Sequence, residues 1–251
     1  MVEFKIPPEV QLAAQVQRSM LPEKIPSVQG YSIWAYCNQA CGVGGDMYDL
    51  QNLPTGEILI LIADVAGKDI SAALGMAYLA GMVPFALSEN GADLCGFVRS
   101  LNEGIVRWAS RIDTLITILV LALDPVRHKL RFANGAHPVA IFRRRDGTVG
   151  PLCPADKIDF PLGVAQGLSY RETTHDFHPS EALLLCSDGI IKARNDKGEE
   201  YGLSRLTVLL GQSRKDAEQV GNALLAELNL FAGNRPMEDD MTAVCISRKR
   251  L

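Results

Sequence analysis

The run Glu57-Ile58-Leu59-Ile60-Leu61-Ile62-Ala63-Asp64 decides the fold, because it is a continuous apolar stretch that ends at a carboxylate. A strand that is apolar at every position is expected where both faces of a sheet are covered. An aspartate at the end of such a strand is seldom there for structure alone, since its charge loses hydration unless something positive meets it. Asp64 is therefore the first candidate functional residue.

Three other segments place aspartate beside glycine or at the edge of an apolar run. They are Val43-Gly44-Gly45-Asp46, Ser187-Asp188-Gly189 and Glu238-Asp239-Asp240-Met241-Thr242. For each motif alone, a structural turn or a solvated loop carboxylate stays open as the alternative. Four such motifs together favour a shared cation site, and oxygen ligands favour Mg²⁺ or Mn²⁺ over zinc or copper.

The glycines of residues 42–46 lack the spacing of a nucleotide-binding loop, since neither GxGxxG nor GK[ST] is present. We interpret the segment as a tight turn whose glycines let the backbone approach a metal while Asp46 supplies a ligand. The carbonyl of Val65, next to Asp64, is a further oxygen donor.

The predicted elements group pairs of helices between runs of strands. Helices are predicted at 9–21, 70–87, 92–110, 203–210 and 216–231, and strands at 31–37, 57–63, 114–123, 129–133, 139–142, 171–177, 182–186 and 241–247. Asp69 is the expected N-cap of the second helix. Turns at Asp124-Pro125 and Asn134-Gly135 predict antiparallel hairpins, and residues 143–170, rich in proline and glycine, predict a surface loop or flap. This order favours packed sheets covered by helices over an alternating βαβ fold.

Composition favours one globular unit without a nucleic-acid surface. The chain has 251 residues, 47% of them apolar, and 25 basic against 29 acidic side chains. Length and apolar content suit one domain, and the charge balance gives no broad cationic face. The cluster Arg143-Arg144-Arg145 precedes Asp146-Gly147, so we predict a solvated hairpin turn, with a phosphate or nucleic-acid patch as the less favoured alternative.

Cysteine usage and hydropathy predict a cytoplasmic protein. The six cysteines form no CxxC pair, so reduced structural thiols are expected. The N-terminus lacks a secretory apolar stretch, and the longest apolar runs, such as 115–123, are expected to be too short to span a bilayer.

The motifs also follow one another in a characteristic order. They are VGGD (43–46), ADVAGK (63–68), FANGAHP (132–138), PLGV (161–164), CSDGI (186–190) and EDDMT (238–242). This series resembles that of the metal-dependent serine/threonine phosphatases, the PPM or type 2C superfamily, and above all its bacterial SpoIIE-like branch. The resemblance covers about residues 15–246, and residues 15–22 look like the helix that enters the catalytic domain in that branch.

The resemblance implies an α+β fold, with a central antiparallel β-sandwich flanked by helix pairs in αββα layers. It divides the chain into an entrance or regulatory helix over residues 1–25 and a phosphatase domain over 26–251. It also implies two Mn²⁺ or Mg²⁺ ions in one active site. Carried over by motif, Asp46 and Asp188 would each hold a metal, Asp64 would bridge both, the Val65 carbonyl would complete one shell and Asp239 would be the last ligand. Asp240 and Asp49 are further acidic candidates, and a metal-activated water would attack phosphorus without a covalent enzyme intermediate.

Some positions depart from the branch pattern. Asp69 stands where glycine is usual, which is compatible with an N-cap. His137 stands where related phosphatases carry a third-metal aspartate, so a third site is not expected. We expect His137 to be buried and hydrogen-bonded, with general acid as the alternative. Lys192 replaces a common acidic residue, and we expect it to alter substrate preference without touching the metals.

The expected function is hydrolysis of phosphoserine or phosphothreonine on a regulatory protein. In this branch the resemblance implies a STAS-type anti-sigma factor antagonist as substrate, and a separate activator or sensor protein. The alternatives are a catalytically silent phosphoprotein-binding module, which the four retained aspartates disfavour, and a small-molecule phosphohydrolase. The stripe Leu12, Val16 and Met20 on the first helix needs a surface to cover it, on the catalytic domain, on a second copy or on an activator.

Overall fold

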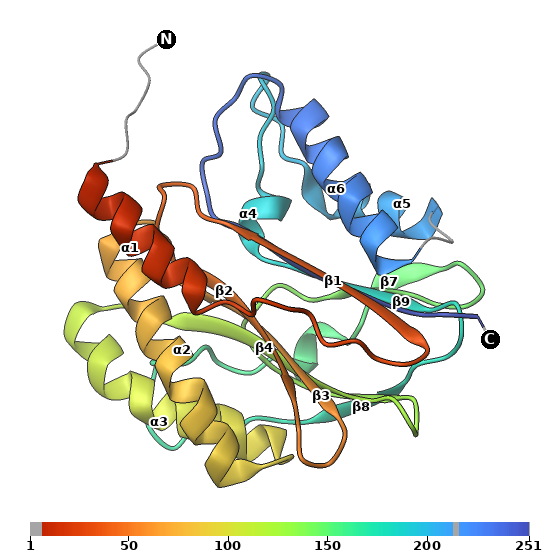
Figure 1. The fold of residues 1–251 in the computed structure, drawn as a ribbon, viewed down its shortest axis with the longest axis horizontal. Coiled ribbons are helices and arrows are strands. Elements are labelled where there is room, and N and C mark those ends of the chain that lie inside the picture. Colours follow the sequence, from red (N-terminus) through yellow and green to blue (C-terminus); the bar gives the residue numbers. More distant parts are fainter. Residues whose placement is uncertain (1–6, 213–215, 251) are drawn as a thin grey trace.

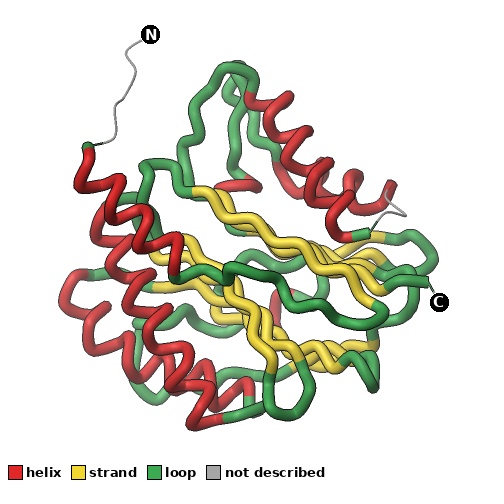
Figure 2. Tube along the Cα trace, viewed as in Figure 1, coloured by secondary structure: helices red, strands yellow, loops and turns green. Residues whose placement is uncertain are grey.

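The computed structural model describes residues 7–212 and 216–250. Residues 1–6 of the expected entrance segment 1–25 therefore lie outside the described residues. Two antiparallel sheets lie face to face with helices on their outer sides (Figures 1 and 2). The β1 sheet has the order β1 (Tyr31–Asn38), β10 (Met241–Arg248), β9 (Ala182–Cys186), β6 (Ile141–Arg143), β7 (Val149–Pro151). The β2 sheet has the order β2 (Asp46–Asn52), β3 (Ile58–Val65), β4 (Ile116–Asp124), β5 (Lys129–Gly135), β8 (Thr173–Asp176).

Four long helices cover the two sheets. Helices α2 (Ile70–Asn90) and α3 (Leu94–Ile112) cover the β2 sheet, and α5 (Gly202–Gln212) and α6 (Ala217–Ala232) cover the β1 sheet (Figure 1). The other helical elements are α1 (Pro8–Ser19), the 3₁₀ turn Ala155–Lys157 and α4 (Asp188–Ile191). The predicted αββα sandwich is therefore confirmed.

Strand β3 shows why its sequence is apolar throughout. Leu59 and Leu61 face the helix-covered cluster, whereas Ile60 and Ile62 face the cluster between the two sheets. All four side chains are fully buried. Since successive strand residues point to opposite faces, a strand covered on both sides must be apolar at every position.

Helix α2 begins as predicted, because the Asp69 side chain accepts the backbone N–H groups of Ser71 and Ala72. By length and composition, this helix could cross a membrane. The expectation that every apolar run is too short to span a bilayer is therefore wrong by the measure of length and composition. One such helix is weak evidence of a membrane span, because the core helix of a globular domain meets the same test. Met76, Leu79 and Val83 of α2 are buried in the cluster against the β2 sheet.

The sequence analysis missed one strand and wrongly predicted one turn. The turn at 42–46 leads directly into β2, which the mixed polarity of Asp46-Met47-Tyr48-Asp49 concealed. Strand β5 continues through the predicted turn Asn134-Gly135, and the backbone instead takes a positive φ of 59° at Ala136.

The segment 143–170 is not simply a surface loop. It includes β7, which pairs with β6 as a hairpin at the edge of the β1 sheet. The Asp146-Gly147 turn of that hairpin is confirmed, but Arg143 is buried rather than solvated. Its guanidinium donates to the carbonyls of Leu210 and Ser180. These carbonyls take the place of the solvent contacts expected for a solvated turn.

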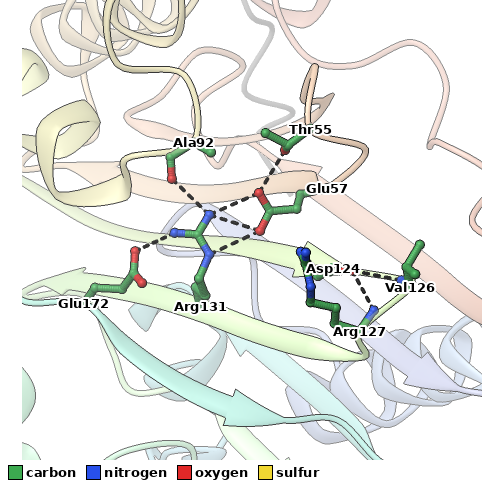
Figure 3. Close-up of polar contacts among 8 residues, drawn as sticks. All are labelled: Thr55, Glu57, Ala92, Asp124, Val126, Arg127, Arg131 and Glu172. Carbon is green, nitrogen blue, oxygen red and sulfur yellow. Dashed lines mark hydrogen bonds and ion pairs between the residues drawn. The ribbon is translucent and has the colours of Figure 1, made fainter.

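An arginine network joins the middle of the β2 sheet to the connection between α2 and α3. Arg131 of β5 donates to both oxygens of Glu57, to Glu172 at 2.8 Å and to the Ala92 carbonyl at 2.9 Å (Figure 3). Opposite charges so arranged compensate the partial burial of the guanidinium, so this network is structural.

Candidate functional site

The structure brings the predicted aspartates together from both sheets. Asp46 is the first residue of β2 and pairs directly with Asp64 near the end of β3. Asp188 begins α4 immediately after β9, and Asp239 precedes β10. The first two carboxylates therefore come from the β2 sheet and the last two from the β1 sheet.

Glycines permit close approach of neighbouring strand ends within each sheet. A Cβ atom at Gly45 would overlap the Val65 carbonyl, and one at Gly189 would overlap the Asp240 carbonyl. The glycines beside the aspartates are thus required by contact with neighbouring backbone, rather than by turn conformation alone.

Asp240 differs from its neighbours because its carboxylate is already bonded to backbone. It accepts the N–H of Ala40 at 2.8 Å through one oxygen and that of Gly45 at 2.8 Å through the other. Asp240 therefore holds the β1–β2 connection next to Asp46. Asp49 lies elsewhere on β2, where it accepts from the Leu50 N–H and the Gln51 side chain, so it is not part of the acidic group.

Burial and mutual repulsion dominate the electrostatics of the site. Burial raises the pKa of Asp46 to about 7, while the Ser187 and Thr242 hydroxyls oppose the rise. Burial also raises the pKa of Asp64 to about 8, and the charges of Asp46 and Asp188 raise it further. Asp46 is 1% exposed and its Oδ2 atom has no hydrogen-bond partner. A buried carboxylate with one unpartnered oxygen, among other carboxylates, fits a divalent cation.

Two lysines neutralise the remaining aspartates. Lys192 Nζ lies 2.6 Å from Asp188 Oδ2, and Lys68 Nζ lies 2.9 Å from Asp239 Oδ2. The expectation that Lys192 stays away from the metal-ligand candidates is therefore wrong, because the single turn of α4 places it four residues from Asp188. Within the described residues, no three His, Cys, Asp or Glu side chains already form a metal cage. Asp64, Asp188 and Asp239 therefore line one recess without forming a ready-made set of three metal ligands among the described residues.

The acidic group opens into two adjoining hollows. A recess of about 230 Å³ is lined by Asp64, Asp188, Asp239, Lys68 and Thr117, among others. A larger hollow of about 680 Å³ shares Lys68 and Asp239 with it and extends along α6. The second hollow is large enough to receive a peptide segment or a small ligand beside the aspartates.

His137 is buried and hydrogen-bonded, as expected. Its Nδ1 atom lies 2.8 Å from the Thr117 hydroxyl, and its backbone N–H donates to the Asn134 side chain at 2.8 Å. Burial lowers the pKa of His137 to about 3, and the charge of Asp188 only partly offsets this. The sequence analysis did not single out Thr117 or Lys68 as site residues, although Lys68 belongs to the quoted motif ADVAGK.

The fold and the motif order are both found in known proteins. A family model described as Stage II sporulation protein E (SpoIIE) matches residues 54–249. The chain belongs to the SpoIIE family. This membership confirms the resemblance stated from the motifs, and the chain is a PPM-type phosphatase of the SpoIIE-like branch, in the serine/threonine protein phosphatase class.

Individual relatives agree with this assignment. The chain is 26% identical to phosphoserine phosphatase RsbU of Bacillus subtilis (strain 168), over 99% of this chain and 72% of RsbU. It is 24% identical to phosphoserine phosphatase RsbP of the same organism, over 73% of this chain and 45% of RsbP, so it spans less than half of that relative. Among solved structures, the SiaA-PP2C domain of Pseudomonas aeruginosa superposes with a TM-score of 0.83 at 21% identity, over 95% of each chain, which establishes the fold.

Proposed function

We propose that this chain is a cytoplasmic, metal-dependent phosphatase that removes phosphate from phosphoserine or phosphothreonine on a regulatory protein. The observation that carries the proposal is the meeting of Asp46, Asp64, Asp188 and Asp239 at one end of the sandwich. The two relatives named as phosphoserine phosphatases support it.

The proposed ligands of two Mn²⁺ or Mg²⁺ ions are Asp46, Asp64, Asp188, Asp239 and the Val65 carbonyl. Such ions, when bound, supply an activated water and offset negative charge on the phosphoryl oxygens. The residues of the chain provide the remaining requirements. Burial of Asp46 keeps bulk water from its carboxylate, and the Asp240 bonds to Ala40 and Gly45 fix the loop that carries Asp46.

The proposed substrate is a phosphorylated STAS-type anti-sigma factor antagonist. The hollow of about 680 Å³ beside the aspartates suits entry of a protein segment, because it is an open groove with apolar and charged walls. A separate activator or sensor protein, or a second copy of this chain, is proposed to act on α1, whose Leu12 and Val16 are 63% and 51% exposed. Because both side chains are more than half exposed, a partner surface is still needed to cover them.

Release of inorganic phosphate from a panel of phosphorylated STAS proteins tests the proposal. The assay is run with Mn²⁺, with Mg²⁺ and with chelator, with a small aryl phosphate for comparison. We expect metal-dependent release from at least one phosphoprotein. Asp64→Asn should abolish it, whereas the matched control Asp49→Asn, on the neighbouring strand but outside the acidic group, should retain most of it.

Each alternative gives a different result. Binding of a phosphoprotein without phosphate release identifies a silent binding module. Rapid hydrolysis of the aryl phosphate with no protein substrate identifies a small-molecule phosphohydrolase. More than about a tenth of wild-type activity in Asp64→Asn removes Asp64 from the bridging role, since loss of an essential metal ligand costs far more than tenfold in rate.

A further inference from the structure

A further hollow, of about 430 Å³, lies where the β6–β7 hairpin meets the end of β10. It is lined by residues 143–147 of the hairpin, by residues 247–250 at the C-terminal end of β10, and by Ser180, Gly211 and Asp216. In Figure 1 this region is on the right, beside β7 and the C-terminus.

Six cationic side chains line this basic hollow, against two carboxylates. The cations are Arg143, Arg144, Arg145, Arg248, Lys249 and Arg250. In the described part of the chain, none of the six takes part in an ion pair. Arg131, by contrast, is paired with carboxylates on two sides of its guanidinium (Figure 3). Uncompensated like charges around one concavity repel each other, and a bound anion removes that cost.

The nearby carboxylates are engaged elsewhere. Asp146 accepts the N–H and the hydroxyl of Thr148, and Asp216 caps α6 by accepting the Gln219 N–H. Glu181, buried behind the hairpin, accepts the N–H groups of His178 and Arg145. None of these three carboxylates pairs with a guanidinium or ammonium group of the basic hollow in the described residues.

Part of the wall is preorganised. Arg143 is buried and bonded to two carbonyls, Arg248 donates to the Phe177 carbonyl at 2.6 Å, and Arg250 donates to the Ser180 hydroxyl at 2.6 Å. Ser180 itself has a positive φ of 72°, and its N–H donates to the Arg248 carbonyl. Fixed donors lose little entropy when they bind an anion, which favours a specific ligand over diffuse attraction.

The basic hollow is separate from the acidic site. Asp239 and Asp240 precede the first residue of β10, whereas Arg248 is its last residue. A strand of that length extends roughly 23 Å, at about 3.3 Å per residue. The two sites therefore lie at opposite ends of one strand and have opposite charge.

We propose that the basic hollow is a binding site for a small anion that carries two or more phosphate or carboxylate groups. Its size matches a small-molecule pocket rather than a nucleic-acid groove. Clustered guanidinium groups favour phosphate and carboxylate because they donate in pairs to such oxygens. The net charge of the whole chain is −4, so the positive charge is local to this hollow.

Anion binding to the chelator-treated enzyme tests this site. Without metal the acidic site repels anions, so pyrophosphate, ATP and citrate report on the basic hollow alone. Calorimetry is combined with thermal melts at constant ionic strength, and sedimentation with vesicles that contain phosphatidylglycerol is measured alongside. At one hundred times Kd, the best anion should raise the melting temperature by roughly 5–10 °C.

The test variant is Arg144→Gln/Arg145→Gln/Lys249→Gln, whose three side chains are exposed and form no side-chain hydrogen bond in the described structure. The matched control is Arg99→Gln/Arg107→Gln/Arg111→Gln on α3, which removes the same charge elsewhere. We expect the first variant to weaken binding by roughly tenfold or more, and the control by less than about twofold.

Three results would overturn the proposal. They are no binding of any of the three anions, equal weakening in both variants, and binding only to vesicles that contain phosphatidylglycerol. The last would indicate a membrane surface in place of a small anion.

Discussion

At the scale of single residues, the acidic site holds more negative charge than its surroundings neutralise. Asp46 is buried and Asp64 is half-buried, and both have raised pKa values. Of the four aspartates, Asp188 and Asp239 have lysine partners among the described residues. An ammonium group and a divalent cation compete for the same carboxylate oxygens. Metal binding at this site should therefore be a cation exchange.

Lys192→Gln should tighten Mn²⁺ binding, because it frees Asp188 from its competing ammonium group. We expect an increase of roughly three- to tenfold in affinity, measured by calorimetry on the metal-free protein. Lys197→Gln is the control, since Lys197 is exposed and outside every ion pair of the described residues. Unchanged or weaker Mn²⁺ binding in Lys192→Gln would show that Lys192 does not compete with the metal.

His137 should make the fold sensitive to acid. Its pKa is about 3 in the folded protein, against about 6.5 in an unfolded chain. Between these pH values the unfolded chain binds a proton that the folded chain does not. The contribution of neutral His137 to the free energy of unfolding is therefore full above about pH 6.5, and it is lost as the pH falls toward 3.

The variant His137→Gln removes this proton uptake on unfolding. Its melting temperature should therefore fall less than that of wild type between about pH 7 and 4.5, although it starts lower because the bond to Thr117 is altered. The exposed His178→Gln serves as the control. Parallel pH profiles for wild type and His137→Gln would refute this role of His137.

At the scale of elements, α1 is attached to the catalytic domain by a polar contact. The Gln17 side chain donates to the Gly44 carbonyl at 2.6 Å and accepts the Gly44 N–H at 3.1 Å, two residues before Asp46. The apolar side chains of Leu12 and Val16 on α1 remain exposed. The contact to the site and the free apolar face suit an element through which a partner acts, as the sequence analysis proposed.

Leu12→Ser/Val16→Ser should change partner stimulation or sedimentation, while the melting temperature shifts by no more than about 1–2 °C. The small shift is expected because both side chains are more than half exposed. Val208→Ser/Leu230→Ser removes two exposed apolar side chains from α5 and α6 and is the control. If the α1 variant matches wild type in phosphatase rate, stimulation and sedimentation, α1 is only structural.

At the scale of the whole molecule, the acidic site joins the two sheets. Asp46 and Asp64 belong to the β2 sheet, whereas Asp188 and Asp239 flank strands of the β1 sheet. Cations held by both pairs would link the halves of the sandwich and relieve their repulsion.

Saturating Mn²⁺ should therefore raise the melting temperature by roughly 5–10 °C, because it binds the folded state alone. Above about pH 8, where the Asp64 carboxylate is ionised, Asp64→Asn should melt higher than wild type without metal, because one of the clustered negative charges is removed; it should also lose most of the rise with Mn²⁺. Asp49→Asn should keep the full rise. A wild-type melting temperature that does not respond to Mn²⁺ would argue against metal ligands from both sheets.

The local sequence pattern is sufficient to predict the helices and strands whose apolar residues follow a clear pattern. The apolar run 57–63 predicts the doubly covered strand observed at 58–65, and the place of Asp69 before a helical run predicts its role as a cap. The order of the motifs was sufficient for the family, the αββα fold and the candidate aspartates. Strand β2 was missed because its apolar and polar residues do not alternate.

The sequence by itself determined which side chains carry the chemistry, since residue type and motif order are local properties. Only the tertiary structure decided what those side chains meet. It placed Lys192 on Asp188, withdrew Asp49 from the acidic group, buried Arg143 and gathered the arginines of residues 143–145 with those of 248–250. The contacts of Lys192 and Asp49 join near neighbours and depend on the backbone that α4 and β2 take. The physical reason for the other two is that burial and charge clustering depend on distances between segments far apart in the chain, which sheet pairing sets and no local pattern records.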